Sequence, residues 1–89
     1  MKLVITVVGV DRVGIIAGVS KVLADNGVNI ESINQTIMDG FFNMIMMCTM
    51  DDKAGLEKVQ NALAKLGTEL GVEIRAQHAD IFLSMHRVG

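Results

Sequence analysis

The sequence predicts a single α+β domain built from four strands and two helices. Its hydrophobic periodicity switches between strand-like and helix-like stretches along 89 residues, a length that suits one domain. An Asp39-Gly40 pair near the middle is typical of a tight turn between two strands. Hydrophobic residues make up 51% of the chain and Pro is absent, so the composition favours a packed globule over a disordered segment.

The first strand and the first helix are predicted from residues 2–8 and 13–26. Residues 2–8 are almost all β-branched and apolar on both parities, which is typical of a strand buried on both faces. From Val13 onward the apolar residues recur at helical spacing. We expect the Asp11 carboxylate to cap this helix and Gly27 to end it in the left-handed conformation.

Two further strands are predicted on either side of the Asp39-Gly40 turn. Residues 28–38 alternate in polarity, but the phase changes partway, which predicts a bulge near Glu31 and Ser32. Residues 41–50 are apolar on both parities and therefore form a second central strand.

The second helix and the last strand complete the predicted domain. Asp51 and Asp52 are expected to cap a helix that Gly71 ends, and its apolar stripe comprises Leu56, Val59, Leu63, Leu66 and Leu70. Residues 72–77 alternate strictly between apolar and polar side chains, as an edge strand does. Residues 79–89 form a C-terminal extension, in which Ile81, Phe82 and Met85 would line one side of a short helix begun by Asp80.

The resulting order is βαββαβ, the ferredoxin-like sandwich, over residues 1–78. This topology places strands 2–8 and 41–50 in the centre of the sheet and both helices on one face. The face without helices should be polar in a monomer, but both sides of the central strands are apolar. Leu3, Ile5 and Val7 share one side of the first strand and Val4, Thr6 and Val8 the other, and in the second central strand Phe42, Met44, Met46, Cys48 and Met50 alternate with Phe41, Asn43, Ile45, Met47 and Thr49. An uncovered apolar face indicates an interface, so we expect a homodimer or a higher homo-oligomer.

Composition argues against several function classes. The net charge of −2, the pI near 5.5 and the scarcity of aromatic residues, with three Phe and neither Trp nor Tyr, argue against nucleic-acid binding. The apolar run at the start is too short to cross a membrane and lacks a cleavage region, so we expect no membrane partner and a cytoplasmic location.

Enzyme, cofactor and metal chemistry find little support. No nucleophile, base and orienting group fall at a recognisable spacing, and His78, Asp80, His86 and Arg87 are typical of a solvated tail. Met44, Met46 and Cys48 invite a copper interpretation, but side chains spaced along one strand do not converge on a point, and Met and Cys commonly fill cores. We therefore expect a non-enzymatic protein without metal or cofactor.

The loop of residues 9–16 is the remaining candidate site, and two interpretations stay open. In the structural one, Asp11 caps the helix and Gly14 lets the first turn pack closely. In the functional one, the free N–H groups at the helix N-terminus bind the carboxylate of a small amino acid, whose ammonium group contacts Asp11.

The same loop resembles that of ACT domains, the small ligand-sensing modules of amino-acid metabolism. The resemblance rests on Asp11-Arg12-Val13-Gly14-Ile15-Ile16, on Asn26-Gly27-Val28-Asn29-Ile30 and on the element order, and it covers residues 2–78. The chain also resembles free-standing bacterial ACT proteins related to the glycine-cleavage repressor. The resemblance implies a regulatory module that pairs with itself and holds an amino acid or similar ligand at subunit interfaces.

Carried over residue by residue, the resemblance assigns ligand binding to Asp11, Gly14, Ile15 and Asn29, with Asp11 and Asn29 as the polar contacts. The chain departs from the family pattern at Val13, where Pro is frequent, and at Gly9, where some amino-acid-binding members carry a polar side chain. The alternative is an interaction module without a small ligand, in which residues 41–50 or the C-terminal extension dock an unidentified protein.

Overall fold

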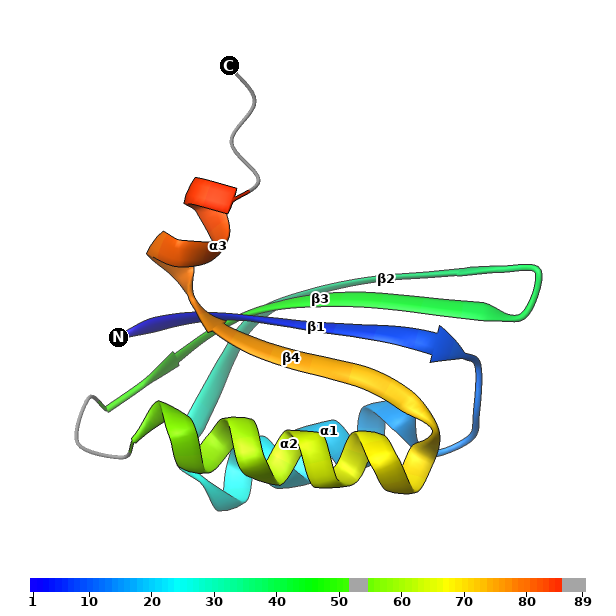
Figure 1. The fold of residues 1–89 in the computed structure, drawn as a ribbon, viewed down its shortest axis with the longest axis horizontal. Helices are drawn as coiled ribbons and strands as arrows, with labels where there is room; N and C mark the ends of the chain where they lie inside the picture. Colours follow the sequence, from blue (N-terminus) through cyan, green and yellow to red (C-terminus); the bar gives the residue numbers. More distant parts are fainter. Residues whose placement is uncertain (52–54, 86–89) are drawn as a thin grey trace.

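The computed structural model describes residues 1–51 and 55–85, which form a four-stranded antiparallel sheet and three helices (Figure 1). The elements are β1 (Lys2–Val10), α1 (Ile15–Asp25), β2 (Val28–Met38), β3 (Phe41–Met50), α2 (Leu56–Leu70), β4 (Val72–His78) and α3 (Ala79–Met85). The sheet order is β2-β3-β1-β4, which confirms the ferredoxin-like topology with β1 and β3 in the centre.

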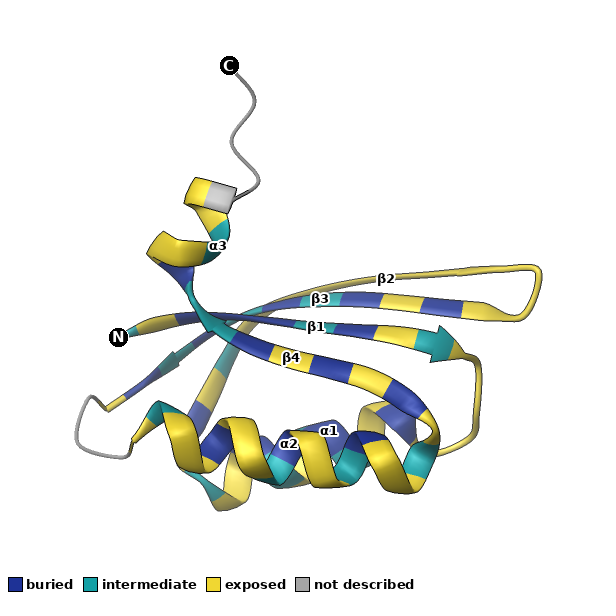
Figure 2. Cartoon of the chain, viewed as in Figure 1, coloured by how far each residue is buried: buried dark blue, intermediate teal, exposed yellow. Residues whose placement is uncertain are grey.

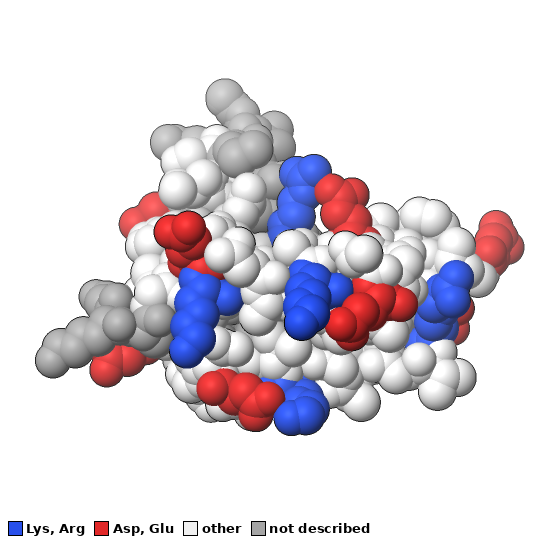
Figure 3. All heavy atoms as spheres, turned by 60° about the horizontal axis from the view of Figure 1, so that its bottom comes forward, with Lys and Arg blue, Asp and Glu red and all other residues white. Residues whose placement is uncertain are grey.

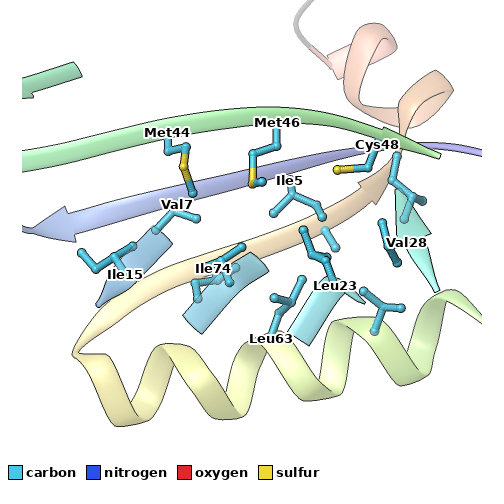
Figure 4. Close-up of a cluster of buried hydrophobic side chains, with 14 of the residues drawn as sticks. Ile5, Val7, Ile15, Leu23, Val28, Met44, Met46, Cys48, Leu63 and Ile74 are labelled. Atoms are coloured by element: carbon cyan, nitrogen blue, oxygen red, sulfur yellow. The ribbon is translucent and has the colours of Figure 1, made fainter. Parts of the chain in front are cut away.

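The hydrophobic core lies between the sheet and the two long helices, which cover the same face (Figures 1 and 2). Figure 4 shows Met44, Met46 and Cys48 of β3 pointing toward the helices beside Ile5 and Val7 of β1. Each of these sulfur-bearing side chains is buried among aliphatic neighbours, so they fill the core as predicted. Burial, with a smaller contribution from Glu31, raises the pKa of the Cys48 thiol to about 11.

The turn and the bulge predicted in the middle of the chain are confirmed. Asp39 and Gly40 both have positive φ angles, 53° and 76°, as a type I′ hairpin turn requires. The register between β2 and β3 shifts between Ile30 and Ser32, so the bulge lies where the polarity pattern changes phase. After the bulge, Asn34 and Thr36 lie opposite Ile45 and Asn43 of β3.

The helix ends are confirmed, but the helix starts are not as predicted. Gly27 and Gly71 both have φ angles of 71° and follow α1 and α2 in the left-handed conformation. Helix α1 begins only after Gly14, which is its N-cap at φ 93°, so the prediction that Asp11 caps this helix is wrong. The left-handed turn at Gly14 moves the helix start beyond the reach of the Asp11 side chain.

A similar correction applies at α2. This helix begins at Leu56 with Gly55 as its N-cap, so Asp51 does not cap it, and Asp52 lies outside the described residues. In both cases a positive-φ glycine, rather than an aspartate, sets the first helical residue. The helical periodicity alone does not determine at which of two neighbouring turns the helix begins.

The C-terminal helix is confirmed, and it lies on the side of the sheet opposite α1 and α2 (Figure 1). It begins at Ala79, one residue before Asp80, and contacts the ends of β1 and β4. Ala79 is buried there and Phe82 is half-buried, whereas Ile81 is exposed. Among the described residues, none of the helices has the length and apolar character that a membrane span requires.

Candidate functional site

The loop between β1 and α1 is held at the hairpin end of the sheet. The backbone N–H of Asp11 donates a 2.8 Å hydrogen bond to the carbonyl oxygen of Gly40, so Asp11 continues the pairing of β1 with the hairpin. The chain then turns through Arg12 and Val13 into the left-handed Gly14. This arrangement leaves the Asp11 side chain exposed beside the start of α1.

The N-terminus of α1 is open in a way that suits an anion. Its first hydrogen bond runs from the Gly18 N–H to the Gly14 carbonyl oxygen at 2.8 Å. The backbone N–H groups of the turn before Gly18 therefore have no acceptor within the helix. Within the described part of the chain, no side chain caps this terminus, and the first turn contains no acidic residue. The positive potential of the helix end is therefore available to an external carboxylate.

Two of the predicted site residues contribute only backbone here. Ile15 is 2% exposed and its side chain belongs to the core, so a ligand would meet its N–H and not its side chain. Gly14 is exposed, and the position that a Cβ would occupy is free of other atoms within 4 Å. Asp11 is thus the one side chain of this loop that the resemblance assigns to ligand contact.

Asn29, the fourth predicted residue, lies at the opposite end of the sheet. It pairs with Thr49 of β3, and Thr49 pairs with Lys2 at the start of β1, whereas Asp11 follows the end of β1. The length of β1 separates the two ends by about 26 Å. A single chain therefore does not bring Asn29 and Asp11 to one small ligand.

Close packing at Gly9 leaves no room for a side chain at this position. A Cβ on Gly9 would lie 2.7 Å from Cγ1 of Val72, at the start of β4. Real Cβ atoms do not approach a neighbour so closely, so a larger residue would push β1 and β4 apart. The close approach of Val72 therefore favours glycine at this position.

Arg12 lies at the C-terminal end of α2. A Cβ on Gly71, the C-cap of α2, would be 3.6 Å from Nε of Arg12, so the guanidinium lies over this helix end. Positive charge is favourable beside the terminal carbonyl groups of a helix. Basic and acidic side chains are interspersed over the face shown in Figure 3.

A depression that the sequence did not indicate lies on the sheet face opposite α1 and α2. We call this the open face; it carries Val4, Thr6, Val8, Asn43, Ile45 and Met47 on the central strands. The depression has a volume of about 310 Å³ and is lined by Thr6, Val8, Asn34, Gln35, Thr36, Asn43, Met44 and Ile45. The bulge is the signal that would have found it, because it turns Asn34 and Thr36 toward this face.

The histidine at the end of β4 takes part in a local contact. The backbone N–H of Asp80 donates to Nδ1 of His78 at 3.3 Å, and the Asp80 carboxylate lies 3.7 Å from the same nitrogen. His86 and Arg87 lie outside the described residues. Among residues 1–51 and 55–85, no three His, Cys, Asp or Glu side chains are grouped to hold a metal ion.

Comparison with known proteins identifies the class to which this fold and loop belong. The family model of the ACT domain matches residues 1–77, and the chain therefore belongs to the ACT domain family. An ACT domain protein from Streptococcus pneumoniae has a closely similar structure, with a TM-score of 0.81 and 43% identity over 92% of this chain and 93% of that one.

Other relatives are similar to this chain either over their whole length or over part of a longer chain. A UPF0237 protein of Methanocaldococcus jannaschii is 49% identical over 88 residues, which is 98% of both chains. A candidate glycine cleavage system transcriptional repressor is 26% identical with a TM-score of 0.77, over 85% of this chain but 44% of that one. The regulatory subunit of aspartate kinase from Thermus thermophilus is 26% identical with a TM-score of 0.68, over 86% of this chain and 50% of that one. The chain is accordingly an ACT domain regulatory module.

Proposed function

We propose that the protein is a non-enzymatic, homo-oligomeric cytoplasmic regulator that binds an amino acid or a similar small carboxylate at the loop between β1 and α1. The observation that carries the proposal is the N-terminus of α1, which is exposed and, within the described residues, bears neither a side-chain cap nor an acidic residue in its first turn. The ligand carboxylate would take the free N–H groups, and its ammonium group would contact Asp11.

The outer edge of β2 supports self-association. From residue 31 to residue 38 every side chain of β2 is exposed, and residues 32–38 contain neither Pro nor a charged residue, the devices that usually protect an edge strand. Ile33 and Ile37 are about half exposed on the side of the sheet that faces the helices. A second copy related by a two-fold axis would add its own β2 in antiparallel orientation and bury both isoleucines.

The opposite edge offers no comparable surface. Gln60 of α2 donates from Nε2 to the carbonyl oxygen of Ala76 at 2.8 Å, so part of the β4 edge is already hydrogen-bonded. Glu73 and Arg75 add an ion pair on the same strand, with Nε and Oε1 2.8 Å apart. The proposed dimer is therefore formed through β2.

Antiparallel pairing of two β2 strands would also complete the ligand site. Because the partner strand runs in the opposite direction, the partner's Asn29 would lie toward the hairpin end of this chain, where Asp11 and Gly14 are found. Each ligand would then contact Asp11 of one protomer and Asn29 of the other. This accounts for two polar ligand contacts that are about 26 Å apart along one chain.

A mixing experiment tests the shared site. The melting temperature of the protein is measured alone and with each of the twenty amino acids; a ligand at about a hundred times its Kd adds roughly 2.7 kcal/mol of stability. The Asp11→Asn and Asn29→Ala variants should each lose the response. The two variants are then unfolded and refolded together. Each heterodimer that forms should contain one intact ligand site of its two and should therefore regain part of the response.

The control variant is Glu69→Gln, which removes one exposed carboxylate from α2 and should leave the response intact. If both variants lose the response and mixing does not restore it, Asp11 and Asn29 do not contact the same ligand, and the proposal of a shared site is overturned. A stable oligomer that responds to none of the twenty amino acids would favour the alternative, an interaction module that docks another protein.

A further inference from the structure

Helix α3 exposes apolar side chains that its own sheet does not cover. Helix α3 contacts β1 and β4, and Ala79 is buried and Phe82 half-buried, but Ile81 is 56% exposed and Leu83 is 59% exposed. A helix of seven residues is too short to be stable alone and depends on packing. In Figure 1 the ribbon of α3 lies on the side of the sheet opposite α1 and α2, which is the side of the open face.

The depression described above lies on the same face and can receive such groups. Val8, Met44 and Ile45 supply its apolar part, and five residues supply hydroxyl and amide groups: Thr6, Asn34, Gln35, Thr36 and Asn43. All eight lining residues are uncharged, so the depression offers no counter-charge to an ionic ligand, and its apolar part can take an aliphatic side chain. Its volume of about 310 Å³ is large enough for one or two leucine-sized side chains.

The helix and the depression occupy different halves of the open face. Helix α3 follows His78, which pairs with Leu3 near the start of β1, whereas the depression surrounds Thr6 and Val8. The two positions are about 10 to 16 Å apart along β1. A two-fold axis that lies between two stacked open faces, perpendicular to the strands, would place α3 of each copy over the depression of the other.

The charges of the open face are compatible with contact between two copies. Glu73 and Arg75 are paired with each other, and Nζ of Lys2 lies 3.9 Å from Oε1 of Glu31. Two such faces therefore meet without an excess of like charge. Four strands about 4.8 Å apart and about 28 Å long present roughly 500 Å². With α3 added, this approaches the area of about 800 Å² that each partner buries in a standard interface.

We propose that the open face binds the open face of a second copy, and that α3 of each copy seats Ile81 and Leu83 in the depression of the other. This interface extends the proposed self-association by a second surface, because β2 pairing uses the sheet edge. The two-fold axis of β2 pairing is perpendicular to the sheet and that of the stacked faces is parallel to it, and two such axes that intersect at right angles generate a closed tetramer. Helix α3 is then an assembly element, and the ligand site at the loop between β1 and α1 remains intact without it.

Cross-linking tests the predicted contact directly. Two single variants, Leu83→Cys and Asn43→Cys, are mixed and oxidised; the native Cys48 is fully buried and does not compete. We expect a disulfide-linked heterodimer from this pair. A matched pair, Leu83→Cys with Glu57→Cys, places the second thiol on α2 across the sheet and should not cross-link. Equal cross-linking of both pairs, or of neither, would overturn the proposal.

The mass of the assembly supplies an independent measurement. The Ile81→Ser/Leu83→Ser double variant should sediment at half the mass of the unmodified protein, because it loses only the open-face interface. An unchanged mass would overturn the proposal. The Ile37→Asp variant should lose the β2 interface and the amino-acid response together. The amino-acid response of each variant therefore distinguishes failure of the proposed ligand site from failure of the α3 interface.

Discussion

Gln60 donates from Nε2 a 2.8 Å hydrogen bond to the carbonyl oxygen of Ala76, so a side chain of α2 satisfies part of the free edge of β4. Ala76 is itself buried against the core, and the bond therefore fixes the helix on the strand beside it. The two edges of this sheet differ in consequence. One is held by its helix, and the other, β2, is available to a partner.

We expect Gln60→Ala to lower the free energy of unfolding by about 1 kcal/mol, the usual contribution of one such hydrogen bond. In a domain of this size the melting temperature should fall by about 4 to 8 °C. Lys65→Ala, at an exposed position of the same helix, is the control and should change the midpoint by less than half as much. Equal effects of the two substitutions would show that the hydrogen bond adds nothing.

Asp11 should be dispensable for folding, because Gly14 and not Asp11 is the N-cap of α1. We expect Asp11→Ala, which would remove a capping side chain, to change the free energy of unfolding by no more than about 0.5 kcal/mol in chemical denaturation. Gly14→Ala should cost about 1 to 2 kcal/mol, because its φ of 93° is unfavourable for any residue with a Cβ. If Asp11→Ala destabilises the protein as strongly as Gly14→Ala, the capping role predicted from the sequence would be restored.

Gly9 and Val72 should show strong energetic coupling. A Cβ on Gly9 meets Cγ1 of Val72 at 2.7 Å, so Gly9→Ala should cost about 1 to 3 kcal/mol through overpacking. The Val72→Ala change removes the offending methyl group, and the double variant should therefore be more stable than the two single effects predict. A double-mutant cycle measured by denaturant unfolding gives this coupling directly. Additive effects would mean that the sheet relaxes around the new methyl group.

The sequence predicted the fold because local periodicity and turn chemistry agree along this chain. The change of phase at Glu31 and Ser32 located the bulge, and the Asp39-Gly40 pair located the hairpin. The helix starts were mispredicted because an aspartate before a helical pattern satisfies the capping rule equally well one turn too early. Only the backbone conformations of Gly14 and Gly55 decide between these starts.

The candidate site was less accessible to sequence reasoning for a geometric reason. Asp11, Gly14 and Ile15 are neighbours in the chain and stay together in the fold. The distance from Asn29 to Asp11 depends instead on the antiparallel register of three strands, which places Asn29 at the far end of β1. The depression on the open face depends on the parity of β2 after its bulge, and finding it requires the predicted bulge to be followed through to the face that each later side chain takes.

Cys48 should make the stability of the protein sensitive to alkaline pH. Burial raises the pKa of its thiol from the ordinary value of 9.0 to about 11, so the unfolded chain loses this proton before the folded protein does. Between these values the folded state binds more protons, and the free energy of unfolding must therefore fall as the pH rises from about 9 to about 11. The loss attributable to this thiol is about 2 to 3 kcal/mol.

Denaturant unfolding at several pH values from 7 to 11 measures this loss, with Cys48→Ala as the control. The variant is less stable at neutral pH because it leaves a small cavity, but the part of the alkaline decline that belongs to the thiol should disappear. Below pH 9 a thiol reagent should label Cys48 only in denaturant, because the side chain is fully buried. Rapid labelling of the native protein, or identical alkaline slopes in both proteins, would mean that Cys48 is not held protonated in the core.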